Sequence, residues 1–405
     1  MIALLLACTS GGAVLDAVID TGKDESAPPD TDSATPTDDT DVEQIPGVGH
    51  PSDILFMDDE LPSFDVLLSD EAFNSLIASP YEWVEGGVIF QGETYAPIGI
   101  RCKGENSFMP ITEKCSLKLS FDRIDEQLRF YKLEGITLNN MNNDASMMHE
   151  RLAYRHFREA GLPAYRSNHA LVSINGEHVG LYALLEDANK DFLKRWYDTP
   201  DGPMYEVWDV DFYDHYISSF QLEVGDDDRT QLQGVADAME LDDADDAYAA
   251  AAEHLDWDQF ADWWAAEITV GQYDSYPYAN PGDDCHVFVN QDNGSRLEWI
   301  PHGMDETYYY PEGVNVFSAA NGIVAKTCIQ VDECKDKVVE RLNWHLDLAD
   351  EIETADYFDY VEDQVNPHVK DDDNKPYSND YVWYYQDLMR DFITGRRNDL
   401  SRWTD

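Results

Sequence analysis

The spacing of apolar residues changes about halfway along the chain, and this change limits the fold class more than any other feature. In the first half, short runs alternate between apolar and polar residues, as Cys115–Phe121 does, which is the period of a strand. Asn175-Gly176 lies between two such runs and is typical of a two-residue β-hairpin. From about residue 229, most apolar residues recur with the period of a helix. A strand-rich half before a helix-rich half predicts an α+β fold with two lobes.

The predicted elements follow from these periods and from the turn residues between them. Strands are expected at residues 53–57, 63–68, 87–90, 95–102, 115–121, 135–139, 170–174, 178–185, 285–290 and 296–300. Helices are expected at residues 70–78, 144–160, 229–240, 244–254, 256–271, 333–353 and 377–396. Asp144 is the predicted N-cap of the first long helix, because a carboxylate there accepts hydrogen bonds from unpaired backbone N–H groups.

The N-terminal residues have the composition of an export signal followed by a tether. Leu5-Leu6-Ala7-Cys8 fits the pattern that bacterial lipoprotein signals place before an acylated cysteine, so Cys8 is the expected lipidation site and residues 1–8 the signal. Residues 9–50 are expected to be a disordered acidic linker, because Asp, Thr, Ser, Pro and Glu dominate them. The alternative is a buried N-terminal strand that happens to contain a cysteine. The first interpretation predicts a protein anchored to a membrane by lipid in the cell envelope, outside the cytoplasm.

Residues 51–405 are expected to form one domain, with a β-rich lobe at about 51–186 and a helical lobe at about 187–405. Apolar residues make up 43% of the chain, which is enough to build a core at this length. No apolar run reaches the roughly 20 residues that a membrane-spanning helix needs. The formal net charge of −55 argues against nucleic acid as a partner, because the surface and the phosphates would repel each other.

The cysteines beyond Cys8 allow two disulfides in an oxidising compartment. Cys102 and Cys115 fall on two predicted neighbouring strands, and five residues separate Cys328 from Cys334. Cys285 would then be unpaired. No Cys-x-x-Cys spacing occurs, so a structural zinc site is not expected.

One segment is basic within this acidic chain. Residues 101–132 contain seven basic and five acidic side chains, whereas residues 201–260 contain eighteen acidic side chains and only Arg229 as a basic one. The basic segment predicts a binding place for an anionic ligand; the alternative is that its lysines only balance neighbouring acids. The acidic runs at 226–228 and 242–246 lack EF-hand spacing. They are interpreted as a solvated face, with Ca²⁺ binding as the alternative.

Three segments of the first half occur in an order that resembles a known family. They are Arg101-x-Lys103-Gly104-x-x-Ser107, then Leu138-Asn139-Asn140 with Asp144-x-Ser146-Met147-Met148-His149-Glu150, and then Ile174-Asn175-Gly176-x-x-x-Gly180-Leu181-Tyr182-x-Leu184-x-Glu186. This order is similar to that of the spore-coat protein H (CotH) kinase family, an atypical branch of the protein-kinase-like fold, over about residues 60–310. The resemblance implies a two-lobed kinase-like fold and an ATP-dependent phosphotransferase that acts outside the cytoplasm.

The resemblance also implies a lysine that binds phosphate and a helix carboxylate that orients it. Lys114 or Lys118 would contact the phosphates of ATP, with Glu150 as the partner, and Lys103 lies in a glycine turn that would cover them. The alternatives are an exposed strand face for the lysines and a surface ion pair for Glu150. Glu186 would lie where the adenine packs, or is an ordinary carboxylate at a strand end.

Further carboxylates surround the predicted hairpin of the second half. The segments are Gln272-Tyr273-Asp274, Pro281-Gly282-Asp283-Asp284-Cys285 and Pro301-His302-Gly303-Met304-Asp305. In the resembled family Asp274 would match the catalytic aspartate and Asp305 a metal ligand, with Asp283 and Asp284 as further ligands of Mg²⁺ or Mn²⁺. Two departures weigh against turnover. Asp283-Asp284 adds negative charge in place of an asparagine-containing segment, and His302 replaces a tryptophan.

These features predict a surface-anchored kinase that transfers the γ-phosphoryl group of ATP to a hydroxyl of an envelope or extracellular protein. The alternatives are a non-catalytic surface binding or adhesion module with the same fold, and a structural coat component whose acidic surface holds cations. The sequence contains no Gly-x-Ser-x-Gly, His-Glu-x-x-His or Walker motif, which argues against the common hydrolases and P-loop enzymes.

Overall fold

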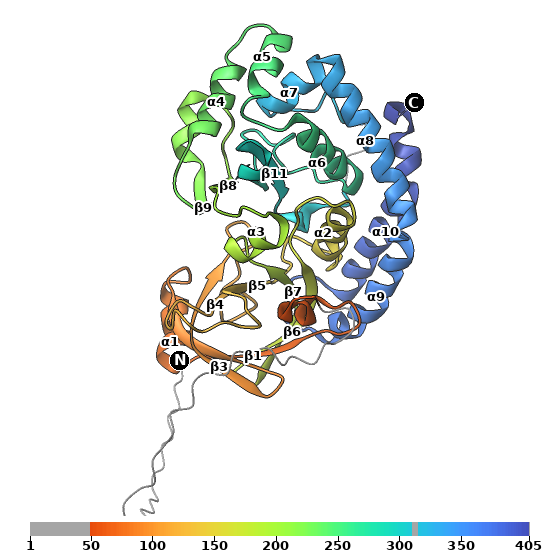
Figure 1. Cartoon of the computed structure of the whole chain (residues 1–405). Helices are drawn as coiled ribbons and strands as arrows, with labels where there is room; N and C mark the ends of the chain where they lie inside the picture. Colours follow the sequence, from red (N-terminus) through yellow and green to blue (C-terminus); the bar gives the residue numbers. More distant parts are fainter. Residues whose placement is uncertain (1–48, 310–314, 405) are drawn as a thin grey trace, which may run out of the picture. The chain divides into compact units, whose positions relative to one another are not determined.

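The computed structural model describes residues 49–309 and 315–404, and Gly47–Asp405 form one compact unit (Figure 1). The predicted lipidation site Cys8 and residues 9–48 of the expected linker lie outside the described residues. The compact unit contains a closed β-barrel, a smaller antiparallel sheet and a set of helices. Strands are concentrated in its first half and helices in its second, which confirms the predicted α+β class at that level.

The barrel occupies the first half of the unit. Its strands are β1 (Ser63–Leu67), β2 (Val84–Phe90), β3 (Glu93–Lys103), β4 (Ser116–Ser120), β5 (Gly135–Asn139), β6 (Ser167–Ile174) and β7 (Glu177–Glu186). They are hydrogen-bonded in the order β1-β2-β3-β4-β5-β7-β6, and the parallel pairing of β1 with β6 closes the barrel. The turn at Asn175-Gly176 has positive φ at both residues, 52° and 82°, as the predicted two-residue hairpin requires.

Alternation along β4 gives this strand one apolar and one polar face. Leu117 and Leu119 are fully buried in the barrel interior, whereas Lys118 lies on the opposite face and keeps 27% of its side chain exposed. The charge of Lys118 acts on Glu223 and His302, both from the second half of the chain. The polar face of β4 is therefore turned toward the second half.

A smaller sheet in the second half carries the remaining strands. They are β8 (Met204–Val207), β9 (Gln221–Val224), β10 (Cys285–Asn290) and β11 (Arg296–Pro301), in the order β11-β10-β8-β9. The buried helix α6 (Trp257–Val270) packs on this sheet, and its Trp263 ring lies 6.3 Å from that of Trp299 in β11. This packing positions two loops, residues 271–284 before the β10–β11 hairpin and residues 302–309 after it.

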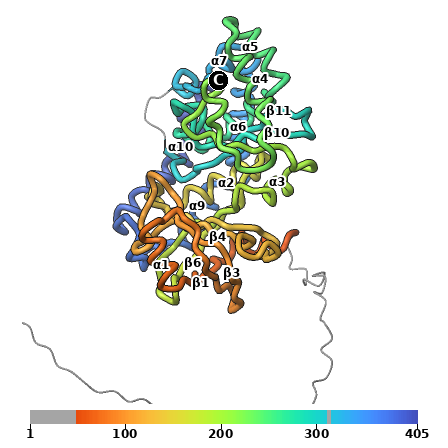
Figure 2. The backbone as a smooth tube through the Cα atoms, turned by 90° about the vertical axis from the view of Figure 1, so that its left-hand side faces the viewer, coloured from red at the N-terminus to blue at the C-terminus, as the bar shows by residue number. Residues whose placement is uncertain are grey.

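The remaining helices cover these sheets. They are α1 (Asp70–Ala78), α2 (His149–Glu159), α3 (Lys190–Trp196), α4 (Thr230–Met239), α5 (Ala244–Ala251), α7 (Ile323–Gln330), α8 (Asp332–Glu351), α9 (Thr354–Asp371) and α10 (Asn379–Thr404). α8 packs on α6 and α9 packs on β7, so the last helices contact both the barrel and the second half (Figures 1 and 2). No helix within the described ranges combines the length and the apolar character needed to cross a membrane.

Some local predictions were wrong for identifiable reasons. Residues 53–56 belong to the 3-10 helix Pro51–Phe56, with Met57 as its C-cap, and not to a strand, because a proline at its first position favours a helical start. α2 begins at His149, five residues after the predicted N-cap Asp144. The Asp144 carboxylate accepts the backbone N–H of His149 at 2.7 Å and holds a separate turn before the helix. α9 was not predicted, since Pro367 lies inside it and prolines normally end helices.

One of the two predicted disulfides forms. Cys328 and Cys334 are bonded, whereas Cys102 and Cys115 are buried free thiols, which corrects the prediction for that pair. The β3–β4 register places Cys102 opposite Leu117, so Cys115 is diagonal to it and not directly opposite. Diagonal neighbours lie about 7–8 Å apart, whereas a disulfide needs Cβ atoms about 3.5–4.5 Å apart.

Candidate active site

The barrel and the second half each contribute charged residues to one site. Lys103 ends β3, and Glu150 lies in the first turn of α2. Asp305 lies in the loop after β11. The charge of Lys103 acts on both carboxylates, and the charge of Asp305 acts on Glu150. A strand lysine, a helix carboxylate and a loop carboxylate therefore interact electrostatically, and we call these three residues the Lys103 triad.

Glu150 is held in place although it is almost completely buried. Its exposed fraction is 3%, and its Oε2 atom accepts a hydrogen bond from Nδ2 of Asn139 at 3.0 Å. Burial and the nearby negative charge of Asp305 raise the pKa of Glu150 well above its ordinary value, while Lys103 lowers it. The charged form of Glu150 therefore depends on a nearby cation, and Lys103 supplies one.

The loop that carries Asp305 is fastened to the loop that carries Asp284. Gly303 has a φ of 59°, and a Cβ atom there would lie 2.0 Å from Oδ1 of Asp284. Only glycine permits this approach. Gln272 donates from Nε2 to the carbonyl of Gly303 at 2.8 Å, and Nδ1 of His149 lies 2.8 Å from the carbonyl of Asp305.

Several carboxylates near these loops repel one another. We call this set the carboxylate cluster, and it consists of Asp274, Asp283, Asp284, Asp305 and Glu306. Burial and the charges of the other members raise the pKa of Asp284 well above its ordinary value. Burial and the charges of Asp274, Asp305 and Asp283 raise the pKa of Glu306 to about 7. Burial is also the main cause that raises the pKa of Asp283 to about 6.

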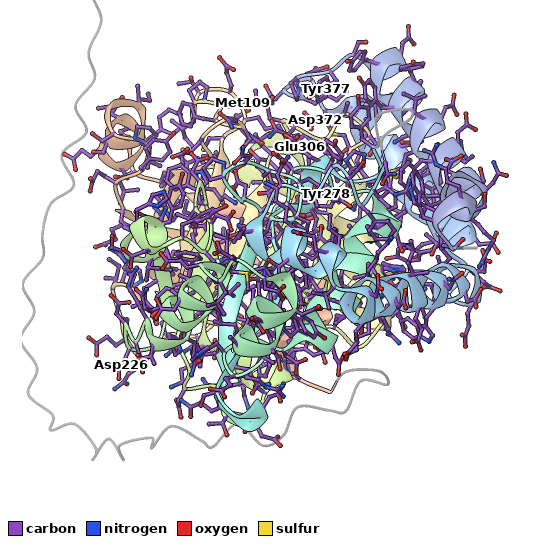
Figure 3. All side chains as sticks on the ribbon, turned by 90° about the horizontal axis from the view of Figure 1, so that it is seen from above. Met109, Asp226, Tyr278, Glu306, Asp372 and Tyr377 are labelled. Atoms are coloured by element: carbon purple, nitrogen blue, oxygen red, sulfur yellow. A yellow bond between two sulfur atoms is a disulfide. The ribbon has the colours of Figure 1, made fainter. Side chains whose placement is uncertain are left out.

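The donor set of this cluster fits a divalent cation of the Mg²⁺ or Mn²⁺ type. Its side chains offer only carboxylate oxygens, which are the ligands that such hard cations prefer. Asp274 is exposed at the edge of the cluster, and partial burial raises the pKa of its carboxyl. Glu306 is also exposed (Figure 3). The predicted residues Asp274, Asp283, Asp284 and Asp305 are thus brought together, and Glu306 joins them.

Lys114 does not contact this site, and its predicted role is corrected. Its side chain is completely buried, and its Nζ atom lies 2.7 Å from Oδ2 of Asp372, which is also completely buried. Oδ2 of Asp372 also accepts the backbone N–H of Leu181 at 3.0 Å. Gly180 makes room for this carboxylate, because a Cβ atom there would lie 2.3 Å from it. Lys114 thus neutralises a buried acid where α9 meets the barrel.

Glu186 is also taken up by internal contacts. It lies at the end of β7 as predicted, but it forms ion pairs with Arg166 and Arg195. Burial alone would raise the pKa of Glu186, yet the two guanidinium groups outweigh burial and hold it below its ordinary value. The carboxylate oxygens of Glu186 thus accept hydrogen bonds from Arg166 and Arg195, and the packing of an adenine at this strand end stays a prediction.

Lys118 is close to the site but outside the Lys103 triad. Its Nζ atom lies 3.9 Å from Asp187, and its charge also acts on Glu206 and Glu223. Its position on the polar face of β4 remains compatible with an anionic ligand.

The sequence predicted that Lys103 lies in a turn over the phosphates, but it did not predict that the charge of Lys103 acts on Glu150. The β3–β4 register that sets its position depends on contacts between distant segments.

His302, which departs from the family pattern, lies beside the site on the small sheet. Its Nε2 atom is 3.7 Å from Oε1 of Glu206, and its ring centroid is 4.4 Å from that of His286. Burial and the charge of Glu223 raise the pKa of Glu206 to about 7. Neither Glu206 nor His286 was predicted as a site residue, and no sequence signal pointed to them.

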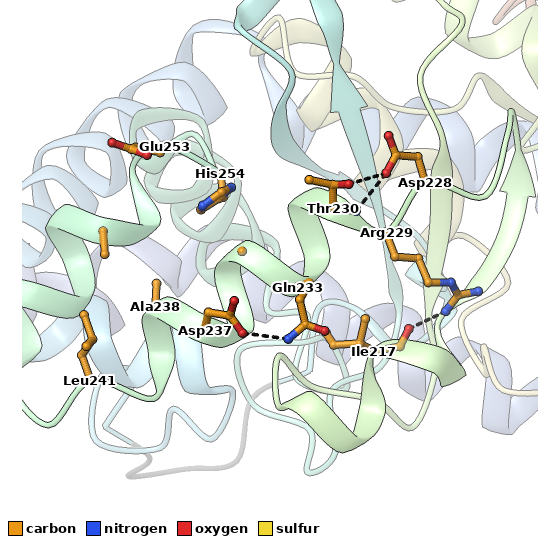
Figure 4. A pocket seen from close by; sticks show the side chains of 12 residues that line it. Ile217, Asp228, Arg229, Thr230, Gln233, Asp237, Ala238, Leu241, Glu253 and His254 are labelled. Atoms are coloured by element: carbon orange, nitrogen blue, oxygen red, sulfur yellow. Dashed lines mark hydrogen bonds between the residues drawn. The ribbon is translucent and has the colours of Figure 1, made fainter.

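Two cavities of the described residues lie elsewhere. One of about 770 Å³ is lined by residues of α4, α5 and their surroundings, including Arg229, Asp237 and His254 (Figure 4). Another of about 370 Å³ lies among α8, α9 and α10. Neither cavity is lined by a member of the carboxylate cluster or of the Lys103 triad. Charge and hydrogen bonding, and not cavity size, identify the candidate site.

Comparison with known proteins identifies the family of this chain. The family model described as CotH kinase protein matches residues 100–400. The chain belongs to the CotH kinase family. A solved structure described as a Helicobacter pylori proinflammatory kinase, CtkA, is 10% identical, and the match covers 74% of this chain and 92% of that one with a TM-score of 0.35. The sequence matches none of the curated proteins with which it was compared.

Proposed function

We propose that this CotH-family protein is an ATP-dependent phosphotransferase that uses Mg²⁺ or Mn²⁺ and transfers a phosphoryl group to a protein hydroxyl. The observation that carries the proposal is the Lys103 triad next to the carboxylate cluster. Phosphoryl transfer needs positioning and charge neutralisation more than covalent chemistry by the protein. A lysine that interacts electrostatically with a helix carboxylate, beside acidic oxygens that suit a divalent cation, supplies the main parts.

Lys103 is the residue that we assign to the phosphates, in place of Lys114. Glu150 is buried and held by Asn139, and the charge of Lys103 acts on it, so a fixed acidic group lies near the lysine. Lys103 would present its positive charge to the phosphates when ATP binds. Lys118, on the neighbouring strand, would add a second positive charge near the ligand.

Asp305 and Asp284 are the residues that we assign to the cation, with Asp283 and Glu306 close enough to contribute. When bound, the cation would offset the charge of the phosphates and of the cluster. The contact between Gly303 and Asp284 and the hydrogen bonds of Gln272 hold both metal-binding loops. We assign Asp274, exposed at the edge of the cluster, to the acceptor hydroxyl, whose proton it would accept or orient.

A two-lobed arrangement follows from these assignments. The barrel would form one lobe with Lys103, and the small sheet with the helices would form the other with Asp305 and Asp284. α2 would connect them, because Glu150 contributes to the site while its helix contacts β6, α6 and α9. Nucleotide would then bind between the polar face of β4 and the loops around the β10–β11 hairpin.

A second candidate function is nucleotide or cation binding without turnover. Asp283 and Asp284 are adjacent acids, and the charge of Asp283 helps to raise the pKa of both Asp284 and Glu306. This excess of negative charge would oppose the approach of a triphosphate. An adhesion or coat role would need binding only, so turnover discriminates between the two functions.

We also propose that the protein acts in the cell envelope, held by lipid at Cys8. The support is the Leu5-Leu6-Ala7-Cys8 pattern and the acidic segment that follows it. The Cys328–Cys334 disulfide is compatible with an oxidising compartment. An envelope or extracellular protein would then be the substrate. Metabolic labelling with a fatty acid analogue should mark the wild type and not Cys8→Ser; equal labelling would contradict the proposal.

The first test of the phosphotransferase proposal is a thermal-shift titration of the full chain with ATP and Mn²⁺. A ligand at a hundred times its Kd stabilises the folded state by about 2.7 kcal/mol, so the wild type should show a rising Tm. Lys103→Met and Asp305→Asn should lose the shift. Asp226→Asn, at an exposed aspartate that projects far from Glu306, is the matched control and should retain it (Figure 3).

Turnover is measured on the same variants with γ-labelled ATP, by autophosphorylation and by ATP consumption. Asp305→Asn should reduce the rate at least about a hundredfold, because it removes a charge aimed at the reacting groups. A nucleotide shift without turnover in the wild type would favour the binding function. No shift in the wild type with either cation would refute both functions.

A further inference from the structure

The small sheet carries a group of metal-ligating side chains that the phosphotransferase assignment does not use. Glu206 of β8 and His286 of β10 are register partners, and His286 is in turn opposite Ile300 of β11. Register partners in an antiparallel sheet project to the same face. His302 lies two residues after Ile300, so alternation returns it to that face as well. Three elements thus bring one carboxylate and two imidazoles together.

The potential ligand atoms of this group already lie close to one another. One such atom from each of Glu206, His286 and His302 lies within 4.8 Å of the other two. Nε2 of His302 is 3.7 Å from Oε1 of Glu206. Bonds of about 2.0–2.1 Å to a tetrahedral ion place ligand atoms roughly 3.3 Å apart. Small side-chain rotations are therefore enough to close the site.

The hydrogen bonds around the two imidazoles leave ligand atoms available. Nδ1 of His286 lies 3.1 Å from the hydroxyl of Tyr165, so its Nε2 atom remains for an ion. Nδ1 of His302 is buried without a hydrogen-bond partner among the described residues. A metal-binding histidine is usually oriented by a hydrogen bond at its other ring nitrogen, and Tyr165 provides such a bond for His286.

We propose that Glu206, His286 and His302 form a binding site for a transition-metal ion of the Zn²⁺ class. Two imidazoles and one carboxylate are a donor set that suits zinc and its first-row neighbours, whereas Mg²⁺ prefers oxygen ligands alone. This chemistry separates the site from the carboxylate cluster. The proposal does not rest on the phosphotransferase function, because the ion would bind without nucleotide.

The site is accessible to solvent, and charged groups of both signs act on it. His286 is buried, but the side chains of His302 and Glu206 are 31% and 28% exposed, so an ion can reach the site from solvent. The charges of Lys103 and Lys118 act on His302 and would oppose a cation, whereas that of Glu223 acts on Glu206 and would favour one. With three protein ligands, an ion keeps a position open for water or another donor.

The test is metal binding by the full chain with Zn²⁺ alone, in 10 mM Mg²⁺ to saturate the acidic surface, followed by Co²⁺ substitution. The wild type should bind one equivalent of Zn²⁺ and give visible Co²⁺ absorption. His302→Phe and Glu206→Gln should each weaken binding more than about tenfold, since loss of a supporting residue alone costs 10–100-fold. Tyr165→Phe should weaken it by about tenfold.

The control is His178→Phe, which changes an exposed histidine of the β6–β7 hairpin and should leave Zn²⁺ affinity unchanged. Glu206→Gln preserves shape, so it tests the site even if an aromatic substitution disturbs folding. Equal Zn²⁺ affinity in the wild type, His302→Phe and Glu206→Gln would overturn the proposal, as would no Zn²⁺ binding by the wild type. Thermal shifts with ATP and Mn²⁺ on the same variants report the phosphotransferase site separately.

Discussion

Two groups of acidic side chains in this molecule have pKa values that are shifted in opposite directions. At the end of β7, Glu186 lies between Arg166 and Arg195, and its pKa is below the ordinary value because the guanidinium charges outweigh burial. In the carboxylate cluster, burial and mutual repulsion raise the pKa of Asp284 well above the ordinary value. Burial acts to raise the pKa of both carboxyls, so burial alone does not explain the difference. The presence of basic partners explains the difference in pKa.

The comparison separates residues that hold the fold from residues that are ready for a ligand. Asp372 belongs with Glu186, since a buried lysine neutralises it. A buried charge with a partner inside the protein has its solvation replaced, whereas a charge without one favours a cation from outside. Perturbed carboxylates without basic partners are therefore the better indicators of function.

The largest effect is expected from Lys114→Met, which removes the partner of Asp372. Both side chains are completely buried, so the variant leaves an uncompensated charge and should lose about 3–5 kcal/mol of unfolding free energy. Urea unfolding followed by circular dichroism measures this loss. Lys118→Met, on the partly exposed face of β4, is the control and should change stability by less than about 1 kcal/mol. If Lys114→Met lost as little unfolding free energy as Lys118→Met is expected to lose, Lys114 would not have a structural role.

A somewhat smaller loss is expected from Glu186→Gln. The amide keeps the shape of the side chain but leaves Arg195 without a charged acceptor and Arg166 with Asp53 alone, at a cost of about 2–3 kcal/mol. The same urea experiment should give a loss within about 0.5 kcal/mol for Glu177→Gln, an exposed residue at the start of the same strand. If Glu186→Gln were as stable as the wild type, Glu186 would belong to the acids that bind a ligand and not to those that hold the fold.

Asp284→Asn should change stability in the opposite direction. Removing one negative charge from the cluster relieves repulsion, so the metal-free protein should gain about 1 kcal/mol of unfolding free energy. The weak contact from Gln272 at 3.4 Å can be kept by an asparagine oxygen. Unfolding in the presence of a chelator measures the gain. A loss above about 1 kcal/mol would mean that Asp284 is structural.

The smallest effect concerns the pH dependence of Glu306. Its pKa is raised from 4.5 to about 7, so between these values the folded chain holds more protons than the unfolded chain. This carboxyl therefore lowers stability progressively as pH rises from about 4.5 to 7. Glu186, with a lowered pKa, contributes stability above its ordinary pKa and loses it as pH falls.

The corresponding measurement compares the wild type with Glu306→Gln in chelator at several pH values. The stability gain of the variant should be present at pH 8 and shrink toward pH 5, where the native carboxyl is protonated. Added Mg²⁺ should reduce the gain at pH 8, because the cation offsets the same charge. A gain that is constant from pH 5 to 8 would contradict the raised pKa.

Much of the fold could be predicted because its signals are local. Alternation along 115–121 predicts a strand, and Asn175-Gly176 predicts a hairpin, as the structure confirms. The carboxylates that the structure brings together, Asp274, Asp284 and Asp305, were also singled out from short motifs around the predicted β10–β11 hairpin. These motifs lie on loops whose positions follow from strands that are themselves predictable.

Contacts between distant segments could not be predicted. Asp372, the partner of Lys114, is 258 residues away, and no local pattern reports it. The electrostatic interaction of Lys103 with Glu150 depends on the register of β3 and on the approach of α2. Glu206 lies on β8, a four-residue strand that alternation does not distinguish from a loop, so its contact with His302 could not be foreseen.

The closure of the barrel also bears on how copies of this protein can associate. Because β1 pairs with β6, the barrel leaves no strand edge with unpaired N–H and C=O groups, which are templates for aggregation. In the small sheet, β11 is largely buried, and the other edge is β9, four mostly exposed residues that include Glu223. A short acidic edge on a chain of net charge −55 is a poor template. The most strand-rich part of the protein is thus also the part least able to seed intermolecular sheets.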